Sequence, residues 1–292
     1  STSYFNRIER NNITTNSAYG VRVLYSSSNN TIQENIIMNN TFGITLNNSP
    51  YNTLKNNNIT NNRYNFGVFG FDLSDFANDV DTSNMVDGKP VYYWVNAHDM
   101  VMPLDAGCLA LVNCTHITVK TLNLTKNVQS ILLANTKNST ITKNNLIESF
   151  YGIGLSFSSD NNIIGNNIEN NYIGISGINS SDNFIYGNNF TNNVGHISIG
   201  NSINFWDDGY PSGGNYWSDY ADVDVKSGPY QNETGSDGIW DHPYTIDKNN
   251  QDNYPIVPEF PSFLIIPLFM IATLLAIIVY KKRAKSDSSY KR

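Results

Sequence analysis

The sequence predicts an all-β solenoid, a parallel β-helix with about 22 residues per coil, followed by a C-terminal transmembrane helix. Apolar residues recur at a step of 22 through four successive units without an insertion, and such self-similarity is typical of solenoids. No unit shows the apolar period of a helix, whereas short runs alternate as strands do. Residues 263–280 contain no charge and are long enough to span a membrane.

Residues 113–205 contain the four regular coils. Three columns of apolar residues repeat there at the step of 22: Val119, Ile141, Ile163 and Ile185; Leu124, Leu146, Ile168 and Phe190; and Ile131, Ile153, Ile175 and Ile197. Successive coils lie about 4.8 Å apart, so like side chains stack, and these columns are predicted to form the buried core. The asparagines between them, such as Asn166 and Asn167, are predicted to form corners. Asn tolerates left-handed backbone, and stacked amides can hydrogen-bond as ladders.

Residues 1–68 repeat less regularly and are predicted to form N-terminal coils. Their columns are Ile8, Ile32 and Leu54; Ile13, Ile37 and Ile59; and Val21, Ile44 and Val68. The N-terminal part of residues 69–112 does not continue the 22-residue repeat. Near the C-terminal end of this segment, Leu109 lies 22 residues before Ile131 and so rejoins the repeat. We therefore expect one or two elongated coils with a protruding loop in this segment.

Charge is distributed unevenly along the chain. The formal net charge is −7, but residues 281–292 carry six basic residues and one acid, so the other 280 residues sum to −12. An acidic body argues against nucleic-acid binding, which requires a cationic surface. Cys108 and Cys114 flank a strand-like run that would hold them apart, so they are predicted to be buried thiols rather than a disulfide.

The C-terminal segment, residues 258–292, has three parts in order. Pro258, Glu259 and Phe260 precede the apolar segment, and the basic run Lys-Lys-Arg-Ala-Lys follows it. By the positive-inside rule, the C-terminus lies in the cytoplasm and the repeats lie outside the cell. This order resembles the C-terminal sorting signal of archaeal surface proteins. The resemblance implies a sorting enzyme that replaces the tail with a lipid anchor, and an unprocessed membrane anchor is the alternative.

An exterior location gives meaning to N-glycosylation sequons, and some of them are expected to carry glycans. The sequons begin at Asn12, Asn29, Asn39, Asn47, Asn58, Asn113, Asn123, Asn138, Asn179, Asn189 and Asn232.

Three stretches carry a resemblance to a known family. They are VDGKPVYYWVN (86–96), NCTHITVKTLNLTKN (113–127) and NFWDDGYPSGGNYWSDY (204–220). Together with the asparagine-rich coils they resemble the NosD-type β-helix family, named for a periplasmic protein involved in copper-site maturation of nitrous oxide reductase. The resemblance covers nearly all of residues 1–257 and implies a right-handed β-helix. Such a resemblance transfers a fold better than a function.

The family name suggests copper handling. His98, Met100 and Met102 alternate along one predicted strand, which would place a histidine and two thioethers on one face. Such soft ligands suit Cu(I). Core methionines on a strand are the competing interpretation, and a copper-handling accessory protein is kept as an alternative function.

An enzyme acting on polysaccharides, a lyase or a hydrolase, is the other alternative. The stretch GHISIG (195–200), which contains His196, and the Asp207-Asp208 pair resemble parts of β-helix galacturonases, although their order differs from that family. Glycosidases need two facing carboxylates at a defined separation. The regular coils offer few acids or cations that could face one another, so no catalytic residue is assigned and the prediction leans towards a protein without enzymatic activity.

Residues 206–257 leave the 22-residue step and become acidic and aromatic. This composition predicts a cap, because the last coil of a solenoid exposes strand edges and core. Hard oxygen ligands on glycine-containing loops also suit Ca²⁺, the only cofactor predicted. The predicted calcium ligands are Asp219, Asp222, Asp224, Asp237 and Asp241.

The sequence therefore favours a non-catalytic, membrane-tethered cell-surface protein, archaeal by resemblance. Its β-helix is predicted to serve in adhesion, envelope structure or glycan binding, because repeating flat faces suit extended ligands. The predicted partners are the membrane, a sorting enzyme and an extracellular glycan.

Overall fold

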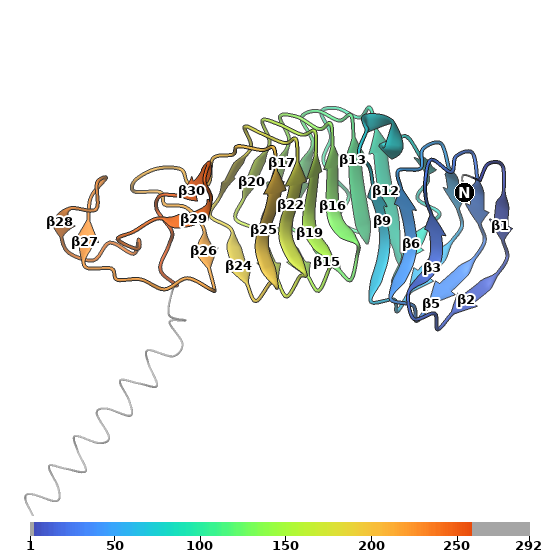
Figure 1. Ribbon diagram of the computed structural model, residues 1–292, viewed down its shortest axis with the longest axis horizontal. Coiled ribbons are helices and arrows are strands. Elements are labelled where there is room, and N and C mark those ends of the chain that lie inside the picture. The colour runs from blue at the N-terminus through green and yellow to red at the C-terminus, as the bar shows by residue number, and fades with distance from the viewer. Residues whose placement is uncertain (1–2, 259–292) are drawn as a thin grey trace, which may run out of the picture. The chain divides into compact units, whose positions relative to one another are not determined.

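The computed structural model describes residues 3–258, in which about nine β-helical turns are stacked (Figure 1). Within that range no helix is long and apolar enough to cross a membrane. The predicted membrane span, and the Glu259 and Phe260 positions of the sorting motif, lie outside the described residues. The predicted all-β solenoid is confirmed.

The first three coils contribute three short strands each. These strands are β1 (Arg7–Glu9), β2 (Asn12–Thr14), β3 (Tyr19–Val23), β4 (Thr31–Gln33), β5 (Ile36–Met38), β6 (Phe42–Asn47), β7 (Thr53–Lys55), β8 (Asn58–Thr60) and β9 (Tyr64–Phe69). Equivalent strands of successive coils pair in parallel, as β1-β4-β7, β2-β5-β8 and β3-β6-β9. Ile8, Ile32 and Leu54 share one column, as predicted.

One predicted column is wrong by two residues. Ile44 pairs with Val21 on one side and with Phe66 on the other, so Val68 stacks on Leu46 instead. The side-chain period of a strand is two, so a shift of two residues keeps the same face towards the core. Hydrophobicity alone therefore cannot exclude such a shift.

Residues 108–200 form the regular coils, again with three strands per coil. These strands are β13 (Cys108–Val112), β14 (Thr118–Lys120), β15 (Asn123–Thr125), β16 (Gln129–Ala134), β17 (Thr140–Thr142), β18 (Asn145–Ile147), β19 (Tyr151–Ser156), β20 (Asn162–Ile164), β21 (Asn167–Glu169), β22 (Ile173–Ile178), β23 (Phe184–Tyr186), β24 (Asn189–Thr191) and β25 (Gly195–Gly200). Ile141, Ile163 and Ile185 pair in one file and are fully buried. The predicted core columns of these coils are therefore confirmed.

The chain reverses its strand direction between the two groups of coils. This segment contains the 3₁₀ helix η1 (Leu73–Phe76) and the strands β10 (Asp79–Val80), β11 (Met85–Val86) and β12 (Lys89–Val95). Strand β11 pairs in parallel with β8 but antiparallel with β12, and β12 pairs in parallel with β13. Ten strands from β2 to β25 thereby form one continuous sheet, a reversal that the predicted elongated coil did not include.

The reversal places two hydrophobic cores on opposite faces of this shared sheet. When the strands of a shared sheet reverse direction and the coils keep the same handedness, the interior of the second group of coils must lie on the opposite face of that sheet. On β13, Leu109 and Leu111 face the core of the C-terminal coils, whereas Cys108, Ala110 and Val112 face the core of the N-terminal coils. All five residues of the strand are consequently buried. Both cysteines are unbonded and buried, as predicted.

Buried asparagines form hydrogen-bonded ladders from coil to coil. Asn144, Asn166 and Asn188 stack so that each side-chain amide donates to the side-chain oxygen of the next, at 2.9 Å in both steps. The left-handed backbone conformation falls on the residue before each rung, as at Lys143 and Gly165. The predicted ladders are therefore present, but neighbouring residues divide the two roles that the prediction assigned to a single asparagine.

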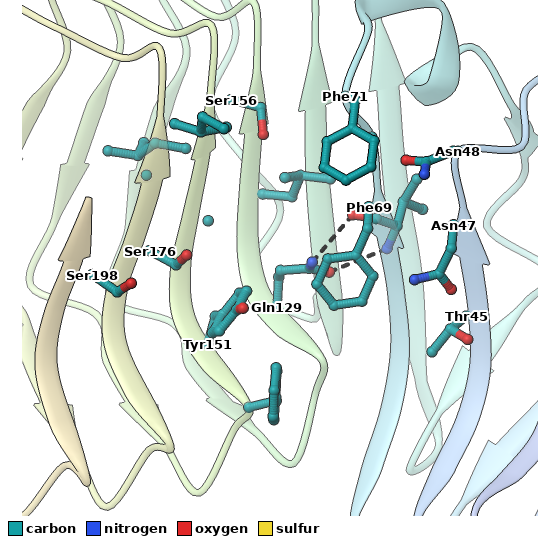
Figure 2. A pocket seen from close by; sticks show the side chains of 18 of the residues that line it. Thr45, Asn47, Asn48, Phe69, Phe71, Gln129, Tyr151, Ser156, Ser176 and Ser198 are labelled. Carbon is teal, nitrogen blue, oxygen red and sulfur yellow. Dashed lines mark hydrogen bonds between the residues drawn. The ribbon is translucent and has the colours of Figure 1, made fainter. Parts of the chain in front are cut away.

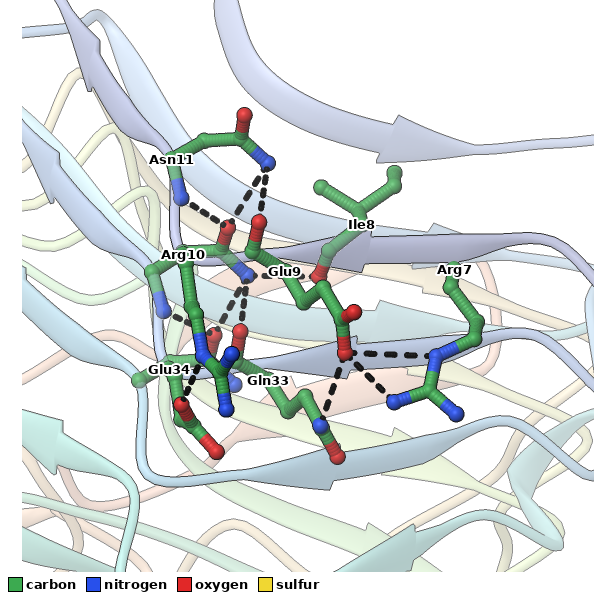
Figure 3. Close-up of polar contacts among 9 residues, drawn as sticks. Arg7, Ile8, Glu9, Arg10, Asn11, Gln33 and Glu34 are labelled. Carbon is green, nitrogen blue, oxygen red and sulfur yellow. Dashed lines mark hydrogen bonds and ion pairs between the residues drawn. The ribbon is translucent and has the colours of Figure 1, made fainter.

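The first coil is joined to the second by the same kind of rung (Figure 3). Asn11 donates its backbone N–H and its side-chain amide to Oδ1 of Asn35, at 3.0 and 3.2 Å. On the outer surface, Nε of Arg10 lies 2.7 Å from Oε2 of Glu34. Exposed ion pairs contribute little to stability, so the backbone ladders and the buried amides, rather than surface charges, connect these coils.

Residues 206–257 cover the C-terminal end of the core. Their strands are β26 (Tyr216–Trp217), β27 (Lys226–Ser227), β28 (Glu233–Thr234), β29 (Tyr244–Asp247) and β30 (Asn250–Asp252). Trp206 and Trp217 are 1% exposed and belong to the C-terminal core. Trp217 is stacked between Phe190 of the last regular coil and Tyr244 of β29. These aromatic rings cover the last regular coil, and the assignment of the whole segment 206–257 as a cap stays a prediction.

Strand β30 also supplies the last rung of two asparagine ladders. Oδ1 of Asn250 accepts the backbone N–H of Asn204 at 2.9 Å. Oδ2 of Asp252 accepts the backbone N–H of Asn215 at 2.7 Å, and Asp252 is fully buried. A carboxyl group therefore occupies a position that asparagine holds in the coils before it.

Candidate functional site

A groove of about 590 Å³ lies between the β3-β6-β9 sheet and the outer face of β16, β19, β22 and β25 (Figure 2). It forms because the N-terminal coils cover only part of the shared sheet. The backbone N–H of Val128 on the shared-sheet side donates to the carbonyl of Phe66 at 3.0 Å. The amide of Gln129 bonds to both the N–H and the carbonyl of Val68, each at 3.1 Å. Beyond β16, the outer faces of β19, β22 and β25 line the groove.

Gly67 permits the close approach of β9 to β16. A Cβ atom at this position would lie 2.4 Å from both Cβ of Val128 and Oε1 of Gln129, which is far inside van der Waals contact. The absence of a side chain at Gly67 therefore allows the Gln129 amide to complete the hydrogen bonding of β9.

Small residues line the uncovered part of the sheet. Gly154, Ser176 and Ser198 stack in one outward-facing column on β19, β22 and β25. Gly154 is buried, Ser176 is half-buried and Ser198 is exposed. The groove is therefore deepest beside the N-terminal coils and opens towards the C-terminal ones.

Aromatic side chains stand at the sides of the groove (Figure 2). The rings of Phe69 and Tyr151 come from opposite sides, with centroids 6.0 Å apart and planes 85° apart. Phe71 also lines the groove and is 74% exposed, an unusual position for a large apolar ring. The groove thus offers apolar faces close to the hydroxyl groups of the serine column.

Two polar atoms in the groove lack a hydrogen-bond partner. Oγ1 of Thr45 and Oδ1 of Asn47 are buried and bond to nothing among residues 3–258. By contrast, the hydroxyl of buried Thr136 donates to the carbonyl of Leu111 at 2.8 Å. An unpaired buried polar group costs about 1–3 kcal/mol, so both oxygens are suited to accept a hydrogen bond from a bound molecule, and the Thr45 hydroxyl can also donate one.

The residues that line the groove include no Asp, Glu, His, Lys or Arg. Its titratable side chains are the phenols of Tyr19 and Tyr151, and burial raises the pKa of Tyr151. The site can therefore supply hydrogen bonds and apolar contact, but it has no charged side chain with which to hold an ion or to transfer a proton near neutral pH.

The five predicted calcium ligands lie in the cap and do not converge on one point. Among residues 3–258, no group of three or more His, Cys, Asp or Glu side chains is arranged to hold a metal ion. Asp224 accepts the backbone N–H of Asp237, and Asp222 accepts that of His242, each at 3.1 Å. Asp241 likewise accepts two backbone N–H groups. These carboxylates hold turns, and calcium binding stays a prediction.

Asp219 pairs with a buried histidine. Nε2 of His196 lies 3.2 Å from Oδ1 of Asp219, and the hydroxyl of Tyr244 donates to Oδ2 at 3.3 Å. Burial lowers the pKa of His196, and the nearby Asp219 carboxylate opposes that shift. Asp207 instead accepts hydrogen bonds from Asn253. No hydrogen bond or ion pair in the described part of the chain joins His196 to Asp207, the two elements considered for catalysis.

The three predicted copper ligands are in different environments. Met102 is 1% exposed and belongs to the C-terminal core, whereas Met100 is 45% exposed. His98 pairs with Asp99, with Nδ1 2.9 Å from Oδ2. The segment also lies outside a regular strand, because β12 ends at Val95. The structure therefore does not present His98, Met100 and Met102 as one set of ligands.

Comparisons with known families agree with this architecture. The family described as NosD, periplasmic copper-binding protein, matches residues 95–222, and the family described as right handed beta helix region matches residues 1–87. Comparison with curated proteins found no match. Residues 3–258 thus form a parallel β-helix, and residues 1–87 match a family of right-handed β-helices. More particularly, the matches and the solenoid together support a NosD-type β-helix. The words copper-binding belong to the description of that family and are not a property shown for this chain.

Proposed function

We propose that this protein binds glycans without cleaving them, and that the groove beside Phe69 and Phe71 is the binding site. The observation that carries the proposal is the lining of the groove, where aromatic rings, amides and hydroxyl groups occur without a charged side chain. Aromatic rings pack against the C–H faces of sugars, and amides and hydroxyls hydrogen-bond to sugar hydroxyl groups. Pockets that bind small molecules combine these two kinds of contact.

The same lining supports binding rather than cleavage. Hydrolysis of a glycosidic bond needs an acid and a second carboxylate on opposite sides of the bond. The groove offers neither group, and the His196–Asp219 pair lies under the cap with its imidazole buried. The polysaccharide-active enzyme is therefore the weaker candidate.

We also propose that the groove is displayed outside the cell by a C-terminal anchor. The support for this part is the order of Pro258-Glu259-Phe260, the apolar segment and the basic tail in the sequence. Protease treatment of intact cells tests the orientation, because the coils should be digested or released while a cytoplasmic marker survives. Mass measurement of the mature chain tests processing, because a sorted protein should lack the apolar segment 263–280 and the basic tail that follows it.

Binding is tested with the purified full chain on an array of neutral and acidic oligosaccharides, followed by calorimetric titration of the best ligand. Phe71→Ala removes an exposed ring from the groove and should weaken binding about fivefold without lowering stability. Phe5→Ala is the matched control, since Phe5 is 79% exposed and does not line the groove. Its affinity should equal that of the unaltered chain.

Two results would overturn the proposal. Failure of every array member to bind would remove glycan recognition. Release of new reducing ends during prolonged incubation with the bound oligosaccharide would replace a binding protein by an enzyme.

A further inference from the structure

We infer that the groove selects an uncharged glycan chain lying along the solenoid axis, and that the Thr45 hydroxyl is a specificity-determining contact. This inference rests on the proposed function and adds to it the class of ligand, its direction and one atom that recognises it. Three independent features of the groove support it: its direction, its charge and its unpaired polar atoms.

The direction follows from which strands line the groove. Residues from β6, β9, β16, β19, β22 and β25 all contribute, so the groove crosses successive strands instead of following one of them. Each strand step is about 4.8 Å, and the Gly154–Ser176–Ser198 column repeats at that spacing. A ligand built from similar units in an extended chain meets a similar surface at each step when it lies along the axis.

The lack of charged lining residues in the groove disfavours acidic sugars. No Lys, Arg or His lines it, and the chain outside residues 281–292 has a net charge of −12. A carboxylate or sulfate held there would lose hydration without gaining a cationic partner, which is strongly unfavourable. Arg22, in the strand next to Thr45, is not a lining residue; its guanidinium lies over the ring of Tyr19, which lines the groove, 4.3 Å from the centroid and stacked on that ring rather than on the Thr45 side chain. An uncharged chain incurs no such cost.

The unpaired atoms identify the recognition residues. Thr45 is 1% exposed, it lies between the inward-facing Ile44 and Leu46, and its side chain therefore points away from the core and into the groove. Oγ1 of Thr45 has no partner among residues 3–258, and Oδ1 of Asn47 on the same strand is also unpaired. A sugar hydroxyl can donate to either oxygen and accept from the threonine hydroxyl. Removing the Thr45 hydroxyl should then affect folding and binding in opposite directions.

The test is the Thr45→Val variant of the full chain, made in a host without a glycosylation pathway because Asn47 begins a sequon. Valine has nearly the shape of threonine and removes one unpaired buried hydroxyl, so the melting temperature should stay equal or rise. Affinity for the best neutral oligosaccharide should fall about fivefold to tenfold. Thr142→Val, on the outer face of β17 away from the groove, is the matched control and should change neither quantity.

Further measurements address charge and direction. An oligosaccharide with the same backbone but carboxylated units should bind at least about tenfold more weakly than its neutral counterpart. Ser198→Trp, at the open end of the groove, should weaken binding of long oligomers and leave binding of a disaccharide unchanged.

Each outcome decides one part of the inference. Equal or tighter binding of the carboxylated chain overturns the selection of neutral glycans, and unchanged affinity in Thr45→Val overturns the role of that hydroxyl. Equal loss of short and long oligomers in Ser198→Trp, or no loss of either, overturns the axial direction. If no oligosaccharide binds at all, the proposed function fails together with this inference. If neutral and acidic oligosaccharides instead bind equally tightly, the proposed function stands and only this inference fails.

Discussion

Replacing Asp252 by asparagine tests whether the cap completes the asparagine ladder of the coils. Oδ2 of Asp252 accepts the backbone N–H of Asn215 at 2.7 Å and the indole N–H of Trp217 at 2.9 Å. Its other oxygen accepts the backbone N–H of Tyr254 at 3.1 Å. Burial raises the pKa of this carboxyl from 3.8 to about 7, although these three N–H donors favour the ionised form; the charge of Asp207 adds to the effect of burial.

The magnitude follows from linkage between protonation and folding. Since the pKa in the folded protein lies above the ordinary value, the native state at pH 5 holds a proton that the unfolded chain has released. The stability contributed by this carboxyl is therefore greatest at low pH and is lost as the pH rises through 7. A pKa change from 3.8 to about 7 makes the contribution at pH 5 about 3 kcal/mol larger than at pH 8. The asparagine side chain in Asp252→Asn does not titrate, so this part of the pH dependence should vanish in the variant.

Urea unfolding of both proteins at pH 5 and pH 8, followed by tryptophan fluorescence, measures this difference. Subtracting the two free energies of unfolding removes every other titrating group that the proteins share. The free energy of unfolding of the variant minus that of the unaltered protein should be about 3 kcal/mol larger at pH 8 than at pH 5. Asp182→Asn, which removes an exposed carboxylate from a regular coil, should show no comparable gain. An equal difference at both pH values would refute the assignment of Asp252 as a buried, protonated final rung.

Three further predictions concern the ladders, the junction and the thiols. Asn166→Ala leaves several buried groups unpaired and should lower the free energy of urea unfolding by at least about 3 kcal/mol, whereas the outward Asn167→Ala should lower it by less than about 1 kcal/mol. Gly67→Ala forces a Cβ into contact with β16 and should cost about 2 kcal/mol or more in the same assay, whereas Gly200→Ala has open space and should cost little. Burial raises the pKa of Cys108 to about 12 and raises that of the other cysteine, so a thiol reagent at pH 8 should find no reactive thiol in the folded protein and two in denaturant. An equal loss of stability in Asn166→Ala and Asn167→Ala would contradict the ladder, and an equal loss in Gly67→Ala and Gly200→Ala would contradict the close contact at Gly67. Rapid reaction of a thiol in the folded protein would contradict the burial of the cysteines.

The repeat itself was predictable because each coil contacts mainly its neighbours. Ile141, Ile163 and Ile185 form a file at a constant step, and the pairing in the structure repeats that step. The wrong prediction that Val68 stacks on Ile44 also comes from relying on the repeat of apolar residues. A displacement of two residues satisfies the alternation equally well, and only the hydrogen-bond register distinguishes the two arrangements.

The ladder ends and the groove could not be read from a constant step. Asn215 is followed in its ladder by Asp252, 37 residues later, and Asn204 is followed by Asn250, 46 residues later. In the groove, Thr45 and Ser176 lie 131 residues apart in the sequence. The small residues in the Gly154 column were a visible signal, but their meaning depends on which part of the sheet the N-terminal coils cover.

The sequence by itself determined the coil length, all but one of the buried columns and the asparagine ladders, because these features depend on side chains that repeat between adjacent turns. The tertiary structure alone decided that strand direction reverses between β11 and β12 and that the two cores therefore share one sheet. It also decided where the aromatic and unpaired polar groups meet in a groove. The physical reason is that packing between outer faces joins residues far apart in the chain, and a periodic pattern records only which side chains face inward.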